Sequence, residues 1–213
     1  MPYGENMKLN RVERVLMNNP GRAAMQRHFE APILERIGGR LVGQRVLEVG
    51  CGRGVGVEVL FKRFGAAEVY AFDLDAAMAR VARRRIQVSG RQAWITVADA
   101  VAIPVRTGAF DAVMDFGAVH HIPNWRLAIA EIGRVLRPGG RFYFMEITRQ
   151  SLDRWVVRQL LDHPLEDRFD REAFQAELER NGLQLERRIE RRWLGDMILG
   201  VGRRQGGAVV GRP

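Results

Sequence analysis

From Arg45 onward the chain alternates short runs of β-branched and aromatic residues with segments in which apolar residues recur at helical spacing. This alternation is typical of βαβ units, in which helices cover a parallel sheet. It predicts strands at 45–49, 68–73, 93–99, 110–116, 141–147, 183–189 and 193–201. Helices are expected at 54–64, 75–86, 125–136 and 170–181. We therefore predict an α/β fold with a seven-stranded, mostly parallel sheet and helices on both faces.

Two amphipathic segments precede the first strand. The first is expected to end at Asn18-Asn19-Pro20, and the second, around Phe29 to Ile37, is expected to bend at Pro32. Forty residues are too few for a separate domain but are enough for a lid. We predict three regions: a helical lid over 1–40, the sheet domain over 41–204 and a flexible tail over 205–213.

A glycine-rich loop follows the first strand, in the sequence VLEVGCGRGVG of residues 46–56. A dinucleotide-binding loop needs G-x-G-x-x-G, but the third position is Val55 in one frame and Val57 in the other. The phosphate-loop pattern G-x-x-x-x-G-K-S/T is also absent from the chain. Glu48, two residues before Gly50, would repel a pyrophosphate by a few kcal/mol and attract an ammonium or sulfonium group. The loop therefore favours a cationic cofactor.

The loop resembles the first motif of class I S-adenosylmethionine-dependent methyltransferases, which have a Rossmann-like sheet. The resemblance continues in order through AFDLDAAM, VADAVAIP, FDAVMDFGAVHHI, VLRPGGRFYFMEI and FDREAFQAELERNGLQ, and covers residues 45–190. The chain is most similar in these motifs to the small-molecule group, the type 11 enzymes like those of ubiquinone and menaquinone biosynthesis.

The resemblance implies S-adenosyl-L-methionine as cofactor and S-adenosyl-L-homocysteine as product. It implies cofactor contacts at Glu48, Gly50, Cys51, Gly52, Asp73, Leu74, Met78, Asp99, Ala100, Asp115 and Phe116. Gly50 and Gly52 would let the methionine moiety lie over bare backbone, with Glu48 near its ammonium group. A backbone carbonyl within 115–117 would also face that amine, and Cys51 would be a small residue without chemistry of its own.

The nucleoside end of the cofactor is expected to meet residues that follow the second and third strands. By resemblance, Asp73 binds the ribose hydroxyls. Leu74 and Met78 flank the adenine, and Asp99 with Ala100 meets its edge. A lone carboxylate at the end of a strand is usually only a loop residue. It is the order of the motifs that assigns these residues to a cofactor.

Methyl transfer is an in-line displacement at an already activated sulfonium, so alignment of the reactants supplies up to about 7–11 kcal/mol. A base is needed only where the acceptor carries a proton. The candidates are His120 and His121 after the fourth strand, Glu146 near the end of the fifth, and His28 in the lid. The alternative interpretation is packing at a helix start or a surface position for the histidines, and a buried hydrogen-bonded carboxylate for Glu146.

Several other methyltransferase classes lack their signature here. The Pro-Pro-aromatic motif of amino-group DNA methyltransferases does not follow the fourth strand. A cytosine-C5 enzyme needs a cysteine nucleophile and an arsenite methyltransferase needs several cysteines, but the single cysteine here lies in the cofactor loop. No paired glutamates lie between Asp115 and Arg126, and Asp115 alone fits a catechol-type metal site, so no metal is predicted. A small-molecule acceptor, lipid-like or aromatic, is the remaining prediction.

The composition changes this picture only through its charge. The 213 residues include 34 Lys+Arg against 25 Asp+Glu, a net charge of +9. Such a field attracts anions, although a solvated basic surface is the simpler interpretation. RNA methylation therefore stays an alternative, without a specific nucleic-acid partner. The basic N-terminal segment and the apolar stretch 149–169 suggest peripheral contact with an anionic membrane.

The lone cysteine suits a reducing compartment, and no apolar run approaches the length of a membrane span, so a cytoplasmic location is expected. Two further alternatives stay open. One is an NAD(P)-binding oxidoreductase, which Glu48 and the missing third glycine disfavour. The other is a catalytically idle cofactor-binding partner of another methyltransferase, which the presence of His120, His121 and Glu146 disfavours.

Overall fold

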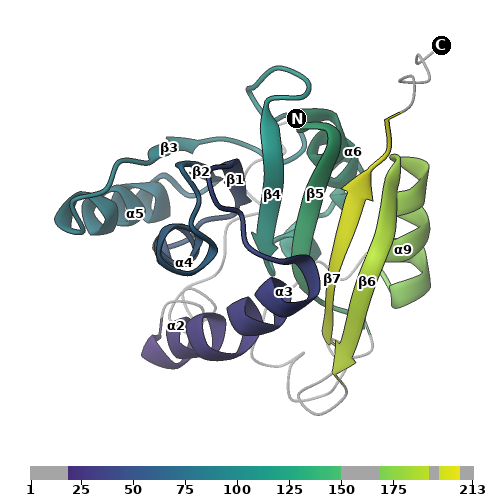
Figure 1. Ribbon diagram of the computed structural model, residues 1–213, viewed down its shortest axis with the longest axis horizontal. Helices are drawn as coiled ribbons and strands as arrows, with labels where there is room; N and C mark the ends of the chain where they lie inside the picture. Colours follow the sequence, from purple (N-terminus) through teal and green to yellow (C-terminus); the bar gives the residue numbers. More distant parts are fainter. Residues whose placement is uncertain (1–18, 150–167, 192–196, 207–213) are drawn as a thin grey trace.

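The computed structural model describes residues 19–149, 168–191 and 197–206. These residues form a seven-stranded sheet in the order β3-β2-β1-β4-β5-β7-β6 (Figure 1). The strands are β1 (Arg45–Val49), β2 (Glu68–Asp73), β3 (Trp94–Val97), β4 (Phe110–Phe116), β5 (Leu136–Ile147), β6 (Leu183–Arg191) and β7 (Met197–Arg204). The first five run parallel, and β7 is antiparallel to both β5 and β6. The predicted mostly parallel, seven-stranded fold is confirmed.

The helical elements are α2 (Pro20–Met25), η1 (Gln26–Glu30), α3 (Ala31–Gly38), α4 (Val55–Val59), η2 (Leu60–Phe64), α5 (Ala76–Val88), η3 (Val119–His121), α6 (Trp125–Val135) and α9 (Arg171–Arg180). Within the described part of the chain, none of them has the length and apolar character needed to cross a bilayer.

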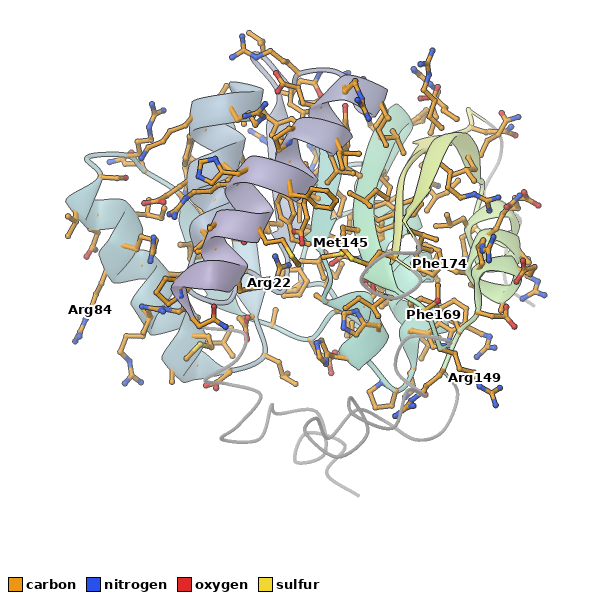
Figure 2. All side chains as sticks on the ribbon, turned by 90° about the horizontal axis from the view of Figure 1, so that it is seen from below. Arg22, Arg84, Met145, Arg149, Phe169 and Phe174 are labelled. Atoms are coloured by element: carbon orange, nitrogen blue, oxygen red, sulfur yellow. The ribbon has the colours of Figure 1, made fainter. Side chains whose placement is uncertain are left out.

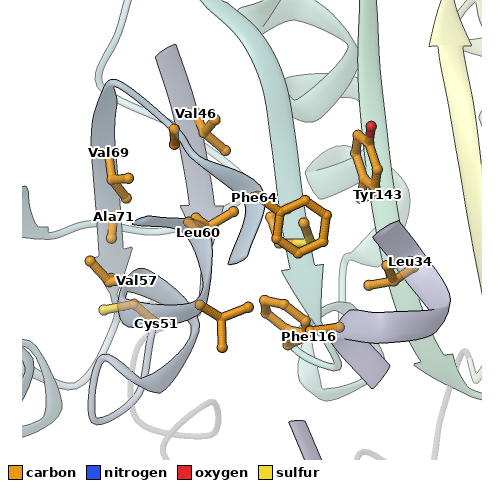
Figure 3. Packing of buried hydrophobic residues seen from close by; sticks show 14 of the residues in the cluster. Leu34, Val46, Cys51, Val57, Leu60, Phe64, Val69, Ala71, Phe116 and Tyr143 are labelled. Atoms are coloured by element: carbon orange, nitrogen blue, oxygen red, sulfur yellow. The ribbon is translucent and has the colours of Figure 1, made fainter. Parts of the chain in front are cut away.

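Two apolar cores lie on opposite faces of the sheet, as expected for helices on both sides. On one face α3, α4, η2 and α5 pack against inward side chains of the strands, for example Phe64 edge-on against Tyr143 with ring centroids 5.9 Å apart (Figure 3). On the other face α6 and α9 contribute Trp125 and Phe174, which pack with Phe169. Figure 2 labels Phe169 and Phe174. This double cover fixes the loops at the strand ends.

The predicted ranges of β1, β2 and β4 coincide with the observed strands. The helix expected at 125–136 ends one residue earlier, because Leu136 already pairs with Phe110 as the first residue of β5. The register then shifts, and Arg141 pairs with Ala112. The Pro-Gly-Gly turn expected to separate helix from strand is therefore an irregularity inside β5. Near the C-terminus, β7 spans Met197–Arg204, and residues 193–196 of the expected strand lie outside the described residues.

The N-terminal segment is one helical run from Pro20 to Gly38 with a π-helical turn in its middle. Asn19 caps it, since its Oδ1 accepts a hydrogen bond from the Arg22 amide at 2.8 Å. The expected bend at Pro32 stays a prediction; the π-helical turn of η1 lies directly before it, and such a wider turn accommodates the proline ring, which would clash with a carbonyl inside a regular α-helix. The first predicted helix, the stretch 150–167 and the tail beyond 206 lie outside the described residues.

Candidate functional site

A cavity of about 370 Å³ opens at the carboxyl ends of β1, β2 and β4. This volume is within the usual range of small-molecule sites, roughly 300–1,000 Å³. The loops after these strands line it, and α2 and η1 close one side with Asn19, Arg22 and Gln26. The residues predicted to contact a cofactor that line it are Glu48, Gly50, Cys51, Gly52, Asp73, Leu74, Met78, Asp99, Ala100 and Phe116.

The glycine loop takes a backbone shape that other residues rarely adopt. Gly50, Gly52 and Gly54 all have positive φ, at 63°, 50° and 78°. A Cβ on Gly50 would lie 2.5 Å from the Cβ of Ala118, so the loop after β1 closely approaches the loop after β4. The glycines therefore bring two loops together at the floor of the cavity.

Asp73 holds this loop from the end of β2. Its Oδ2 accepts a hydrogen bond from the Gly52 amide at 2.8 Å, and its Oδ1 accepts one from the Asp75 amide at 2.8 Å. Burial raises the pKa of Asp73, and the two amide donors partly offset this. The carboxylate thus orders the loop, and each oxygen keeps a lone pair with which it could accept a further hydrogen bond.

Glu48 is a carboxylate buried at the cavity wall. It is 2% exposed, and its Oε2 has no hydrogen-bond partner among the described residues. Burial raises the pKa of Glu48 well above its usual value, and the neighbouring Asp73 and Asp115 raise it further. A buried carboxylate is costly unless a cation or donor meets it. This oxygen therefore fits a positively charged group in the cavity.

Gly56 makes room for that carboxylate, a role that the sequence motif did not show. A Cβ on Gly56 would lie only 1.8 Å from Oε1 of Glu48 and 2.8 Å from Nε2 of Gln26. Gly56 is the second residue of α4, where alanine would normally stabilise the helix. The constraint comes from packing between α4 and β1, so it becomes visible only in three dimensions.

Replacing Gly56 with alanine should lower the free energy of unfolding by about 1–3 kcal/mol, since the new methyl group overlaps the Glu48 carboxyl group. Denaturant unfolding measures the change. In a Glu48→Ala background this overlap is gone and only the end of the flexible Gln26 side chain must move, so Gly56→Ala should cost much less there. An equal loss in both backgrounds would contradict this role of Gly56.

Asp115 is the predicted cofactor residue that the structure places beneath the cavity rather than on its lining. Its side chain is fully buried, and its Oδ1 accepts a hydrogen bond from the Ala118 amide at 2.8 Å. Burial raises the pKa of Asp115 well above its usual value, and the adjacent Glu146 carboxyl group raises it further. Asp115 thus supports the loop after β4 through its hydrogen bond to the Ala118 amide.

Glu146 holds the short helix η3 from below. Its Oε1 accepts a hydrogen bond from the Val119 amide at 2.8 Å, and its Oε2 accepts one from the His120 amide at 3.2 Å. His120 Nδ1 lies 2.6 Å from the same Oε2. Burial raises the pKa of Glu146 to about 7, although the hydrogen bonds to Asp115 and to backbone amides lower it in part. Burial also lowers the pKa of His120 to about 4, so its imidazole is neutral.

His121 is the candidate base that lines the cavity. It is the last residue of η3, and its ring lies 4.1 Å from the ring of His120, centroid to centroid. His120 and Glu146 lie behind it, outside the cavity lining, and His28 is exposed on η1. The structure thus brings three of the four predicted candidates together but presents one of them to a ligand.

Arg22 is a cavity residue that the sequence pattern did not indicate. Its Nη1 donates to both oxygens of the buried Glu30, at 2.9 and 3.0 Å, and its Nη2 donates to the carbonyl oxygen of Phe116 at 2.9 Å. The bond to Phe116 fastens α2 to the end of β4, while the bonds to Glu30 stay within the N-terminal helical run; Figure 2 labels Arg22. The only signal in the sequence was Asn19-Pro20, the start of the helix that carries it.

With this geometry in place, the comparison with known proteins decides the family. A methyltransferase domain model matches residues 47–144, which run from β1 through most of β5. Residues 47–144 belong to the class I methyltransferases. The glycine loop, the end of β2 and the loop after β4 that line the cavity all lie inside this methyltransferase domain.

Curated relatives share this methyltransferase domain. A fatty-acid O-methyltransferase of Mycolicibacterium smegmatis is 36% identical over 125 residues, which are 58% of this chain and 44% of the relative. The phthiotriol/phenolphthiotriol dimycocerosates methyltransferase of Mycobacterium leprae is 34% identical over 118 residues, 55% of this chain and 43% of the relative. The chain therefore spans less than half the length of these relatives.

Solved structures share the fold. A S-adenosylmethionine-dependent methyltransferase from Aquifex aeolicus superposes with a TM-score of 0.73 at 18% identity, covering 92% of this chain and all of that one. A Pyrococcus horikoshii protein superposes with a TM-score of 0.72 at 18% identity, covering 89% of this chain and 93% of that one. At such identities the likeness establishes the Rossmann-like fold of the methyltransferase domain.

Proposed function

We propose that this chain transfers a methyl group from S-adenosyl-L-methionine to an oxygen atom of a lipid-like small molecule. The observation that carries the proposal is Glu48, a buried carboxylate with an unpartnered oxygen at the wall of a cavity in a methyltransferase domain. The names of the curated relatives, a fatty-acid O-methyltransferase among them, support the lipid-like acceptor.

The lining residues fit such a cofactor in charge and shape. Glu48 would face its ammonium group, and the bare backbone of Gly50 and Gly52 would lie beneath the methionine moiety. Asp73 would accept hydrogen bonds from the ribose, while Leu74, Met78, Asp99 and Ala100 would surround the adenine. When bound, the cofactor supplies an electrophilic methyl group on sulfur, so the protein chiefly aligns the acceptor.

His121 would receive the proton of a hydroxyl acceptor, because among the candidate bases it lines the cavity. A carboxylate acceptor carries no proton at neutral pH, and His121 would then only orient it. Glu146 would keep the loop of His121 in place through its hydrogen bonds to η3. Glu146 and His120 are thus positioning residues in this mechanism.

The N-terminal region 1–40 would act as a lid over the domain that spans 41–204. Support comes from Asn19, Arg22 and Gln26, which form one side of the cavity. The hydrogen bond from Arg22 to the Phe116 carbonyl would hold this lid against the domain, and the ion pair with Glu30 would keep the Arg22 side chain oriented for it. We also propose a cytoplasmic location, which the single, unpaired Cys51 supports.

The experiment is a transfer assay with S-adenosylmethionine that carries a trideuterated methyl group. The acceptors are a medium-chain fatty acid, a long-chain alcohol, an alkyl phenol and a short single-stranded RNA, and mass spectrometry detects the labelled methyl group. We expect label on at least one apolar acceptor and none on RNA. Label on RNA alone, or cofactor binding without turnover on any acceptor, would contradict the proposed function.

A further inference from the structure

The outer side of α5 and the adjacent edge strand β3 form an unusual surface. Residues 76–98 contain five arginines and neither aspartate nor glutamate. Arg80, Arg83 and Arg84 are exposed on α5, and Arg91 is exposed in the turn before β3. Figure 2 shows Arg84 pointing away from the body of the protein. We call these residues, with the apolar ones described next, the α5–β3 surface.

Exposed apolar side chains lie among these arginines. In the described part of the chain six large hydrophobic residues are exposed, and four of them belong to this short stretch: Val81, Val88, Trp94 and Val97. Val88 is 90% exposed and Trp94 51% exposed. Trp94 stacks on Tyr70 with centroids 4.6 Å apart and therefore lies on the α6 and α9 face of the sheet, across from α5, so it is left out of the α5–β3 surface. Clustered apolar exposure of this kind marks an interaction site.

The charges of this surface are only partly used within the fold. Arg83 Nε donates to the carbonyl oxygen of Ile95 at 2.8 Å, which protects the open edge of β3, and Arg85 lies 3.4 Å from Glu58. Among the described residues no carboxylate pairs with Arg80, Arg84 or Arg91. The surface therefore presents positive charge, together with apolar groups, to a partner outside the chain.

We propose that the α5–β3 surface docks on an anionic lipid bilayer. Arginines bind the lipid phosphates, and each basic residue near such a surface contributes about 1 kcal/mol. Exposed valine side chains such as Val81 and Val88 suit the boundary between headgroups and acyl chains. A single-stranded nucleic acid would instead favour several aromatic rings for base stacking, and residues 76–98 expose only Trp94, which lies on the other face of the sheet from α5.

This docking would place the cavity next to the membrane. Met78 and Arg85 belong to α5 and also line the cavity, so the helix that meets the bilayer is itself part of the cavity wall. The proposal rests on charge and exposure alone. It would hold whether or not the acceptor is a lipid, and its test needs no turnover.

The test is sedimentation of the full chain with vesicles of phosphatidylcholine containing 30% phosphatidylglycerol, and with vesicles of pure phosphatidylcholine. We expect binding to the anionic vesicles that weakens with salt. The double variant Arg80→Gln/Arg84→Gln should bind about 30-fold more weakly, since two contributions of about 1 kcal/mol are lost. Val88→Ser should also weaken binding, and both changes lie on the surface of a helix, where they leave the fold intact.

The matched control is Arg187→Gln/Arg188→Gln, which removes the same charge from exposed positions on β6 at the opposite edge of the sheet. It should lower vesicle binding by no more than about 2-fold, as expected for a long-range effect of net charge. An equal loss in both double variants would overturn the proposal, and so would an absence of binding to anionic vesicles. Tighter binding to a short RNA with the same dependence on Arg80 and Arg84 would assign the surface to nucleic acid instead.

Discussion

Replacing His121 with alanine is expected to lower kcat for a hydroxyl acceptor by about 10²- to 10⁴-fold, the usual contribution of a general base. His121 lines the cavity, whereas its neighbour His120 is buried against Glu146. The effect should be much smaller for a carboxylate acceptor, because no proton leaves that group during transfer. The labelled-methyl assay measures both rates, and calorimetry checks that the affinity for S-adenosylhomocysteine changes less than about 3-fold.

The matched control for this change is His28→Ala. His28 is exposed on η1 and does not line the cavity, so kcat should stay within about 2-fold of the original value. A loss of rate in the His28 variant as large as in the His121 variant would refute the assignment of the base. Equal losses on hydroxyl and carboxylate acceptors would show that His121 orients the acceptor without taking a proton.

Replacing Glu146 with alanine should lower the free energy of unfolding by about 3 kcal/mol. The change leaves three buried groups without their acceptor: the amides of Val119 and His120 and the His120 ring. Each such loss costs about 1–3 kcal/mol, and the removal of a buried carboxyl group offsets part of the sum. Glu146→Gln keeps one oxygen that can accept from η3, and a smaller loss is expected.

The same variant separates positioning from simple stability. Because η3 carries His121 at its end, kcat should fall at least about 10-fold, even at a temperature where the variant is fully folded. The control is Glu131→Ala, which removes a carboxylate that accepts from the Ile103 amide at 2.8 Å and binds Arg134, away from η3. That variant should lose stability but keep its kcat. An unchanged kcat in Glu146→Ala would mean that Glu146 only stabilises the fold.

The sequence predicted the central strands to the residue, because β1, β2 and β4 are short apolar runs that end at charged or glycine-containing turns. It misplaced the start of β5, since Leu136 continues the apolar spacing of α6 and nothing local shows that it pairs with Phe110. A proline-glycine-glycine turn normally marks the boundary between a helix and a strand. Here it lies inside β5, where the pairing with β4 shifts in register around it.

Most residues that line the cavity could be predicted from motif order, because they lie at or just after the ends of strands whose place in the sheet the order fixes. Contacts between distant segments could not. Arg22 bonds to the carbonyl of Phe116, which lies 94 positions away, and Glu146 supports a turn 26 and 27 positions away. Such contacts depend on how elements pack, and a residue's type and neighbours do not reveal them.

The charge of Glu48 makes the cofactor preference measurable. Its pKa is raised in the ligand-free protein, so a proton is bound more tightly there than in an exposed glutamate. A bound ammonium group favours the carboxylate, and binding should therefore release this proton. The affinity for S-adenosylhomocysteine should accordingly rise with pH, until the pH exceeds the pKa of Glu48 in the ligand-free protein.

The most direct test is isothermal titration calorimetry of the full chain with S-adenosylhomocysteine and, separately, with NADH. Binding of S-adenosylhomocysteine at one molecule per chain is predicted, with affinity that increases as the pH rises above the usual pKa of a glutamate, about 4.3, and with no detectable binding of NADH. Uptake of NADH by a protein that ignores S-adenosylhomocysteine would contradict the central claim that this cavity selects a cationic nucleoside over a pyrophosphate.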